Sequence, residues 1–271
     1  MFELSLVTLV QNIHLQVLSK NKIKSILQLN TKKQRTLRSE FLVEGPKLFE
    51  EALNNDWQIL EVYATEEYVE QSHVQASEQL KDLKLFIVTA KDLQVIGNLE
   101  SNKHVAALVK IKSHPIERLD WQNSVSLVLD DVRDPGNMGT IIRTASWFGI
   151  KNIFCSENSV DVFNPKVVQA SMGAVFSCNV VSTNINELCK QAATNPDFKI
   201  FGAFMDGEPS KAINQLKAGF LVLGSESHGI SNEIEQHVSS KINIARGEES
   251  ATESLNVAIA NAILCYELTR N

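Results

Sequence analysis

Hydrophobic positions alternate or run together in short stretches over the first hundred residues. Four strands are predicted there, at residues 41–45 with a turn, 59–64, 85–89 and 105–111. Pro46 opens a predicted helix over residues 47–54, because the fixed φ of proline suits the first position of a helix. With the basic helical stretch that precedes these elements, this half is predicted to form a small α/β unit.

The second half alternates strand and helix patterns more regularly. Strands are predicted at residues 126–129, 152–155, 174–181, 200–204, 220–223 and 241–244. Helices are predicted from Met138, over 165–174, after Asn186 and from Leu255. Strands separated by helices of this length indicate an α/β fold with a mostly parallel sheet covered on both faces. Ligands of such sheets bind at the carboxyl ends of the strands.

A polar stretch over residues 112–123 separates the two halves. A chain of 271 residues is long for one average domain, and 44% hydrophobic with 21% charged residues is an ordinary globular composition. We therefore expect two domains, at residues 1–115 and 116–271.

The net charge of −6 argues weakly against nucleic acid as a partner, but the charge is unevenly distributed. Between residues 20 and 47, eight basic residues face two acidic ones, Glu40 and Glu44. The basic residues are Lys20, Lys22, Lys24, Lys32, Lys33, Arg35, Arg38 and Lys47. Such a run is either a solvated helix face or a surface for RNA phosphates, and charge alone leaves both interpretations open.

Cysteine usage and hydropathy bear on the compartment. The four cysteines, Cys155, Cys178, Cys189 and Cys265, form no C-x-x-C pair and are interpreted as buried small hydrophobic residues, so no metal site is expected. Residues 4–10 are apolar, but Glu3 and no basic segment precedes them, which argues against an export signal. No apolar run of about 18 residues predicts a membrane span. We expect a cytoplasmic protein.

Three predicted strand ends carry unusual sequence, the first of them at residues 130–143. Residues 134–136 form a turn, and Asn137 is predicted to be the N-cap of the next helix. Arg143 and Trp147 lie off the apolar stripe of that helix. A guanidinium near a helix N-terminus is suited to phosphate. An exposed arginine after a capped turn would look the same.

The second strand end is a glycine-rich exit from the strand at 220–223, with a carboxylate, Glu226, between Gly224 and Gly229. Glycines allow backbone to approach a ligand closely, and the carboxylate can meet hydroxyls or a cation. The pattern is neither a dinucleotide fingerprint nor a P-loop. His228 is interpreted as a hydrogen-bonding loop residue rather than a catalyst.

The third strand end leads through a glycine-containing acidic loop to a final helix that is apolar almost all round. Ser254 is predicted to cap this helix. Its small residues suit a tight contact within or between subunits. Asn256 lies inside the apolar segment, and a buried amide there would require hydrogen-bond partners.

Together, and in this order, these segments resemble the three motifs of the SpoU (TrmH-like) RNA ribose methyltransferases. The matching residues are Asn137-x-Gly139-x-Ile141-x-Arg143, Leu223-Gly224-x-Glu226-x-x-Gly229 and Ser254-Leu255-Asn256-Val257. The similarity covers residues 124–271. The amino-terminal half resembles the small substrate-binding domain, similar to a ribosomal protein fold, that many members carry. Its typical segment is Phe41-Leu42-Val43-Glu44-Gly45-x-Lys47.

The resemblance implies the SPOUT fold, a parallel sheet whose carboxyl-terminal segment threads a loop to form a trefoil knot. It implies methyl transfer from S-adenosylmethionine to a ribose 2′-hydroxyl of structured RNA, by a homodimer whose sites combine residues of both subunits. The RNA is either ribosomal or transfer RNA, and ribosomal RNA is favoured. The implied cofactor contacts are Gly224, Ile242, Ile244 and Leu255. The implied catalytic group is Asn137, Arg143, Glu226, Ser254 and Asn256.

These residue types suit the chemistry. Methyl transfer is an in-line displacement, so the main task is to hold the ribose oxygen against the methyl group with water excluded. We expect Arg143 to anchor phosphate and stabilise the developing alkoxide rather than to act as a base, since a guanidinium in a protein stays protonated. Asn137, Ser254 and Asn256 would orient Arg143 or the ribose.

The chain departs from the family pattern in two places. Ile242-Asn243-Ile244 replaces the usual Ile-Pro-Met, and the loop from there to Ser254 is several residues longer. Ser225 and Ser227 replace the common Asn and Gly. The first of these departures lies at the predicted cofactor contacts Ile242 and Ile244.

Three alternatives are weighed against this function. One is an RNA-binding protein without catalysis, in which the knotted half only dimerises. A second is a SPOUT enzyme that methylates a base nitrogen, and a third is a metabolic enzyme that binds a phosphorylated small molecule between Asn137 and Arg143. Retention of Arg143 and Asn256 disfavours the first alternative, and the presence of all three motifs disfavours the second. A basic surface that spans the first domain and the site would argue against the third.

Overall fold

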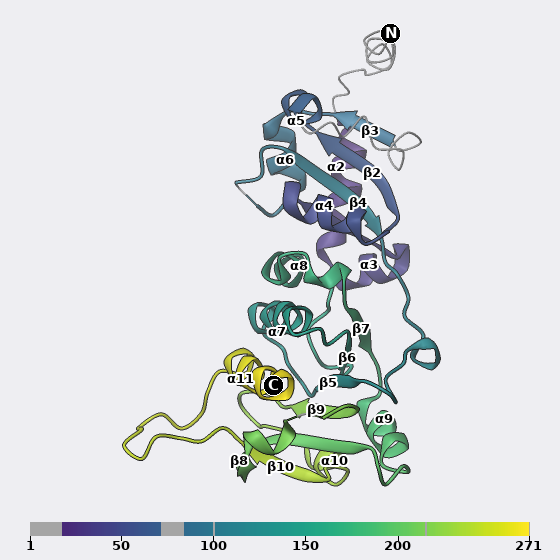
Figure 1. Cartoon of the computed structure of the whole chain (residues 1–271). Coiled ribbons are helices and arrows are strands. Elements are labelled where there is room, and N and C mark those ends of the chain that lie inside the picture. The colour runs from purple at the N-terminus through teal and green to yellow at the C-terminus, as the bar shows by residue number, and fades with distance from the viewer. Residues whose placement is uncertain (1–17, 72–83, 100, 215, 271) are drawn as a thin grey trace, which may run out of the picture. The chain divides into compact units, whose positions relative to one another are not determined.

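The computed structural model describes residues 18–71, 84–99, 101–214 and 216–270, which divide into two compact units (Figure 1). The first unit holds the residues up to Lys112 together with Phe163–Pro165, and the second holds the remainder from Ser113 onward. The apolar run at residues 4–10 lies outside the described residues.

The first unit contains a four-stranded sheet in the order β1-β4-β2-β3. Its strands are β1 (Glu40–Glu44), β2 (Ile59–Ala64), β3 (Lys84–Ile87) and β4 (Val105–Lys110). Its helices are α2 (Lys20–Leu27), α3 (Lys32–Arg38), α4 (Pro46–Asn54), α5 (Glu66–Gln71) and α6 (Ala90–Ile96), with a 3-10 turn, η1 (Gln28–Asn30). The four predicted strands and the helix after Pro46 are confirmed, with ends that shift by one or two residues.

Glu44, from the segment at residues 41–47 that resembles the family's substrate-binding domain, has a structural role in this unit. Glu44 is 3% exposed at the end of β1. Its two oxygens accept the backbone N–H groups of Asn98 and Leu99 at 2.9 and 3.1 Å. A buried charge is tolerated when it is hydrogen-bonded in this way, and the contact ties the loop after α6 to the sheet.

The second unit contains a six-stranded sheet in the order β10-β8-β9-β5-β6-β7, in which all neighbouring strands are parallel. Its strands are β5 (Val125–Leu129), β6 (Asn152–Cys155), β7 (Asn179–Ser182), β8 (Lys199–Pro209), β9 (Gly219–Leu223) and β10 (Ser240–Asn243). Its helices are α7 (Pro135–Trp147), α8 (Pro165–Ser171), α9 (Ile185–Ala192), α10 (Asn232–Glu235) and α11 (Val257–Thr269). Its 3-10 turns are η4 (Ile116–Arg118), η5 (Ala174–Phe176) and η6 (Ser210–Ile213). The predicted α/β class and parallel sheet are confirmed.

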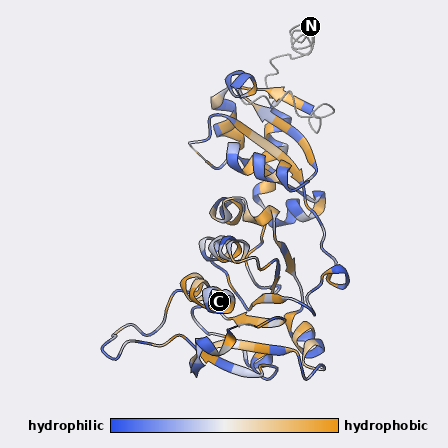
Figure 2. Cartoon of the chain, viewed as in Figure 1, coloured by the Kyte–Doolittle hydropathy of each residue, from blue (hydrophilic) through white to orange (hydrophobic). Residues whose placement is uncertain are grey.

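Helices cover both faces of this sheet, which explains why its central strands β5, β6 and β9 are almost continuously apolar (Figure 2). On one face, α9 and α10 pack over Val128, Phe154 and Phe220. On the other, α7 and α11 lie against each other beside the sheet (Figure 1). Both faces of the central strands β5 and β9 are therefore core.

The starts of α7 and α11 differ from the prediction. Helix α7 begins at Pro135, with Asp134 as the N-cap whose carboxylate accepts the N–H of Asn137 at 2.8 Å. Helix α11 begins at Val257, and Asn256 rather than Ser254 is its N-cap. Aspartate and proline together form a stronger start signal than the asparagine two residues later, so Asn137 was wrongly assigned as a cap. The third difference is the predicted strand at 174–181, which is the turn η5 followed by the short β7.

Gly139 of the first motif allows α7 to approach α8 closely. A Cβ atom at this position would lie 2.4 Å from the Cβ of Ala170 and 2.8 Å from the carbonyl oxygen of Val167. Such distances cannot be relieved by turning a side chain, because one of the atoms belongs to the backbone. The glycine is thus explained by packing.

All four cysteines are buried and free, as predicted. Burial raises the pKa of the Cys178 thiol to about 11 and those of the other three to about 12, so these thiols stay protonated. In the described part of the chain, no helix is long and apolar enough to cross a membrane. Among the same residues, no group of three or more His, Cys, Asp or Glu side chains is placed to hold a metal ion.

Candidate active site

Three loops meet at the carboxyl edge of the second sheet. The first joins β5 to α7, the second follows β9, and the third joins β10 to α11. Strands β5 and β9 are neighbours, so the first two loops start side by side. The third starts two strands away from β9, beside β8, and crosses to the start of α11, which packs against α7.

The carboxylate of Glu226, in the second loop, binds one amide from each of the other two loops. Its Oε1 accepts hydrogen bonds from Nδ2 of Asn137 and, at 3.2 Å, from Nδ2 of Asn256. The Asn256 Nδ2 also donates to Oδ1 of Asn137 at 3.0 Å. The three side chains form a closed triangle, and residues 89 and 119 positions apart in the sequence are in contact.

The triangle lies where two helix N-termini converge. Asn256 accepts the N–H groups of Ala258 and Ile259 through its Oδ1, at 3.0 and 3.3 Å, as N-cap of α11. Asn137 is the third residue of α7. The N-termini of both helices therefore lie beside the Glu226 carboxylate. Asn256 is exposed rather than buried, but it has the hydrogen-bond partners that the sequence called for.

A cavity of about 620 Å³ opens next to Glu226, between the second and third loops. It is lined by all four residues implied as cofactor contacts, Gly224, Ile242, Ile244 and Leu255. Glu226 and Ser254 also line it, whereas Asn137 and Asn256 reach it only through Glu226. Ser254 is exposed on the third loop and is not brought into hydrogen-bonding contact with the triangle.

Arg143 is not part of this arrangement within its own chain. It lies six residues beyond Asn137 on α7, which is about 9 Å along the helix axis and about a third of a turn away in direction. Its side chain is exposed, on the same outward stripe as Thr140 and Trp147, the latter 84% exposed. Both Arg143 and Trp147 lie off the apolar face, as predicted.

Gly224 and Gly229 make the second loop compact. A Cβ on Gly224 would lie 2.0 Å from the backbone carbon of Gly229, and Gly229 has a φ of +67°, in the left-handed region. Ser225 and Gly229 exchange two backbone hydrogen bonds of 3.1 and 2.9 Å. His228 bonds Ser227 through Nδ1 at 2.7 Å, as expected of a loop residue.

Part of the cavity wall was not foreseen from the sequence. The predicted strand at 200–204 extends to Pro209, and its pairing with β10 changes register between Lys241 and Ile242. The irregular segment places Phe204, Met205 and Asp206 on the cavity. Lys241 lies over the Phe204 ring at 4.5 Å and pairs with Glu235 at 2.6 Å, and this pairing raises the pKa of the lysine. A bulge between strands leaves no periodic signal, so only the pairing reveals it.

Arg246, on the long third loop, is the other unforeseen residue of the cavity, and it donates to the carbonyl of Ser250. Among the residues that line the cavity, it is the one arginine or lysine, opposed by the carboxylates of Asp206, Glu226, Glu235 and Glu253. The charge of the lining is therefore predominantly negative.

Comparison with known families gives two matches that together span both units. Residues 124–266 match the SpoU rRNA Methylase family, and residues 20–107 match the MRM3-like substrate binding domain. The Bacillus subtilis 23S rRNA (guanosine(2553)-2′-O)-methyltransferase RlmP is 30% identical over 248 residues, which cover 91% of this chain and 95% of the relative.

Solved structures agree over nearly the whole chain. A TrmH-family structure from Porphyromonas gingivalis has 34% identity and a TM-score of 0.82, covering 93% of this chain and 98% of that one. An AdoMet-bound rRNA methyltransferase from Sinorhizobium meliloti has 27% identity and a TM-score of 0.82, covering 93% and 96%. These matches confirm the expected SPOUT fold and the S-adenosylmethionine dependence. The chain belongs to the SpoU rRNA methylase family of S-adenosylmethionine-dependent RNA methyltransferases.

Proposed function

We propose that this protein methylates a ribose 2′-hydroxyl of ribosomal RNA, as a cytoplasmic homodimer whose active sites draw residues from both subunits. The observation that carries the proposal is the Glu226 triangle beside the cavity lined by Gly224, Ile242 and Leu255. The RNA class follows the rRNA methyltransferases that the chain is similar to. The buried, free cysteines fit a reducing compartment.

The residues of the cavity fit S-adenosylmethionine. Its volume lies within the range of roughly 300–1,000 Å³ that is usual for small-molecule sites. Leu223, Ile242 and Leu255 offer apolar surface for an adenine ring. The surplus of carboxylates suits a ligand that carries a sulfonium and an ammonium group. When bound there, the cofactor supplies an electrophilic methyl group.

The chain's own task is then to hold the ribose and to manage its proton. Glu226 is oriented by two amides, and its carboxylate can accept a hydroxyl of the ribose in turn. The helix N-termini at Asn137 and Asn256 provide a positive potential for the developing alkoxide. The triangle of Asn137, Glu226 and Asn256 holds no cation that could neutralise this alkoxide. Arg143 is the cationic residue of the three motifs that can supply it.

The position of Arg143 supports a site built from two subunits. It lies about 9 Å along α7 from the Asn137 that contacts Glu226 and, like the rest of its stripe on α7, is exposed. In a two-fold symmetric dimer, the same surface patch of both subunits forms the interface, so α7 of one subunit can lie against α7 and α11 of the other. The Arg143 of one chain can in this way complete the triangle of the second chain.

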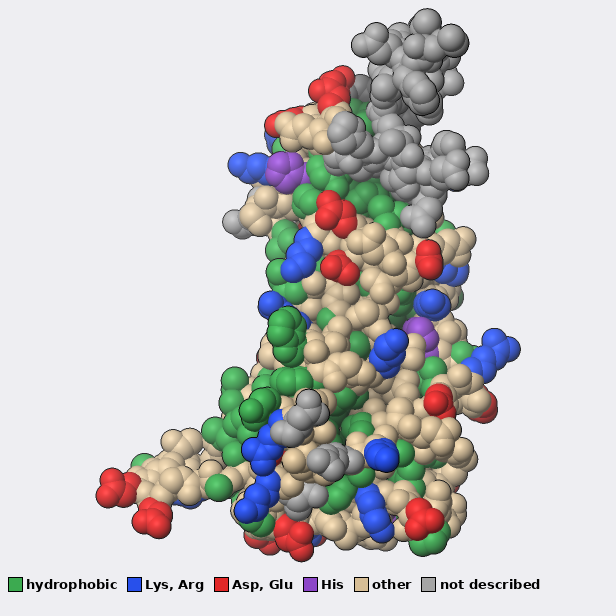
Figure 3. Space-filling model, in the orientation of Figure 1, with side chains coloured by type: hydrophobic (Ala, Val, Ile, Leu, Met, Phe, Trp, Pro, Cys, Tyr) green, Lys and Arg blue, Asp and Glu red, His purple; other side chains and the backbone are tan. Residues whose placement is uncertain are grey.

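An apolar surface on α7 and α11 supports the dimer. Leu255, Ile259 and Tyr266 are 47–54% exposed on or beside α11, and Trp147 is exposed at the end of α7. Figure 3 shows hydrophobic side chains gathered over α11. Because α11 is apolar on its outer side as well as its inner side, a second copy of this surface is the partner that it fits.

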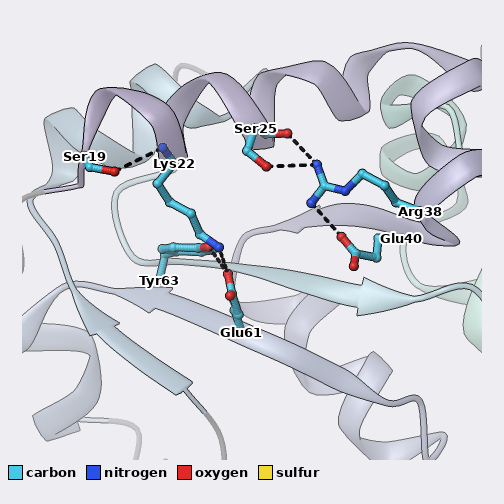
Figure 4. A network of polar contacts seen from close by, with 7 residues as sticks. All are labelled: Ser19, Lys22, Ser25, Arg38, Glu40, Glu61 and Tyr63. Carbon is cyan, nitrogen blue, oxygen red and sulfur yellow. Dashed lines mark hydrogen bonds and ion pairs between the residues drawn. The ribbon is translucent and has the colours of Figure 1, made fainter.

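The eight basic residues between positions 20 and 47 fall into two groups, and this supports an RNA-binding role. Three are engaged internally: Lys22 pairs with Glu61, Arg38 bonds Ser25 and Glu40 (Figure 4), and Arg35 is buried with its guanidinium on the carbonyl of Leu29. The others are exposed, and these are Lys20, Lys24, Lys32, Lys33 and Lys47. The exposed group leaves positive charge available for phosphates.

Gly224→Ala is expected to reduce S-adenosylmethionine affinity at least a hundredfold, because its Cβ would overlap the backbone of Gly229. The measurement is a calorimetric titration of the purified chain with the cofactor. Gly247→Ala is the matched control, since Gly247 also lines the cavity and a Cβ there meets no atom within 4 Å. Equal affinities for the two variants would remove Gly224 from the cofactor site.

Arg143→Ala is expected to lower kcat about 10²–10³-fold, the typical cost of one transition-state donor, with cofactor affinity within about twofold of the wild type. Turnover is measured with tritiated S-adenosylmethionine on total RNA from cells in which this gene is deleted. Undiminished kcat would exclude Arg143 from the reaction.

Mixed dimers decide whether that arginine acts across the subunit boundary. An Arg143→Ala chain paired with a Glu226→Ala chain retains one intact site if each site takes Arg143 from one subunit and Glu226 from the other. A purified heterodimer of the two variants should then show about half of the wild-type turnover, and an equal, randomly paired mixture about a quarter. No return of activity in a verified mixed dimer would place both residues in one chain's site.

Replacing Lys24, Lys32 and Lys33 with alanine is expected to weaken binding of the same RNA about tenfold and to lower the slope of log Kd against log salt by about 1–2. Lys22→Ala is the control. It lies on α2, as Lys24 does, but its charge is already paired with Glu61. A slope that is identical in the triple variant and the wild type would show that α2 and α3 do not contact phosphate.

A further inference from the structure

Asp130 is a buried carboxylate that none of the three motifs includes. It follows β5 directly and is only 8% exposed. An aspartate is seldom buried unless its charge is hydrogen-bonded, because removing a charge from water is unfavourable. Its contacts therefore indicate what it holds in place.

Asp130 binds both ends of the loop that carries Glu226. Its backbone N–H donates to the carbonyl of Leu223, the last residue of β9, at 2.8 Å. Its Oδ2 accepts the backbone N–H of Ser231 at 2.8 Å. The seven residues between these two points, 224–230, include Glu226. Asp130, which lies 101 positions before Ser231 in the sequence, thus joins the two ends of this loop through hydrogen bonds.

The loop itself is stiff, so its base decides where Glu226 points. Ser225 and Gly229 are joined by two backbone hydrogen bonds, and Gly224 lies directly on Gly229. A segment braced in this way moves as a unit about its two ends. The orientation of its carboxylate relative to α7 and α11 is set where the loop joins the sheet, that is, at Asp130.

The other side of Asp130 is equally well fixed. The N–H of Asp131 donates to Oγ of Ser156 at 2.9 Å, and that of Val132 to Oγ of Ser159 at 3.2 Å. The two serines are hydrogen-bonded to each other at 2.9 Å. The turn that leads from β5 into α7, and so to Asn137, is therefore anchored to the loop after β6.

We propose that Asp130 is a positioning residue for methyl transfer: by holding Leu223 and Ser231 it aims Glu226 at Asn137 and Asn256 and sets the Gly224 wall of the cofactor cavity. The proposal rests on the proposed function. It assigns Asp130 no contact with RNA or cofactor, and it requires only that its side chain accept the N–H of Ser231.

Two substitutions remove this hydrogen bond from opposite sides. Asp130→Ala removes the acceptor. Ser231→Pro removes the donor, and proline is compatible with the φ of −66° that Ser231 adopts as N-cap of α10. Ser231→Ala, which keeps the N–H, and Asp130→Asn, which keeps an acceptor oxygen, are the matched controls, since the Ser231 side chain does not cap α10.

The experiment measures kcat at saturating cofactor, cofactor affinity by calorimetry and the melting temperature for these four variants and the double variant Asp130→Ala with Ser231→Pro. We expect kcat to fall tenfold or more in Asp130→Ala and Ser231→Pro, to recover to within about threefold in Asp130→Asn, and to stay within about twofold in Ser231→Ala. The double variant should be no worse than about threefold below either single variant, because both changes break one bond.

Two results would overturn the proposal. One is a lowered melting temperature with kcat retained in Asp130→Ala and Ser231→Pro, which describes a structural residue. The other is a double variant whose kcat loss is the product of the single losses. Failure of the proposed function is seen separately, as absence of methylation by the wild-type chain on RNA from the deletion strain.

Discussion

The site depends on one carboxylate at the meeting point of two helix N-termini. Glu226 accepts amide hydrogens from Asn137, in the first turn of α7, and from Asn256, the N-cap of α11. A negative charge there is favoured by both helix dipoles, and the two amides orient it without neutralising it. Asn137 and Glu226 are 89 positions apart in the sequence, and Glu226 and Asn256 are 30 positions apart. The fold of the second unit brings these three side chains to one point.

The parallel sheet makes this convergence possible. Because β5 and β9 are neighbours, their carboxyl ends deliver the first two loops to the same edge. The close contact of α7 with α8 at Gly139 and the packing of α11 on α7 then bring the two helix starts together. An apolar outer surface on α11 remains, which is the physical reason to expect a second subunit at this place.

Much of this could be predicted from the sequence, because strand burial and turn chemistry are local. The strands at 59–64 and 152–155 were predicted to the residue, and the three loops were identified by their polar residues. The starts of α7 and α11 were missed by three and two residues. Near each helix start, more than one side chain could serve as the N-cap. The three-dimensional path of the chain determines that Asp134 caps α7 and Asn256 caps α11. The irregular stretch of β8 that brings Phe204 and Asp206 to the cavity was missed because its cause is a register shift against a strand thirty residues later.

The central claim is that Asn137 and Asn256 are held by the same carboxylate, and side-chain amide NMR tests it most directly. In the wild-type protein, one Nδ2 proton of each asparagine should exchange with solvent about tenfold more slowly than a free amide. Glu226→Ala should accelerate exchange at both amides, to the free rate for Asn137 and by less for Asn256, because the Asn256 Nδ2 keeps its hydrogen bond to Oδ1 of Asn137. Exchange at the free rate in the wild type, or unchanged exchange at either amide in the variant, would contradict the account.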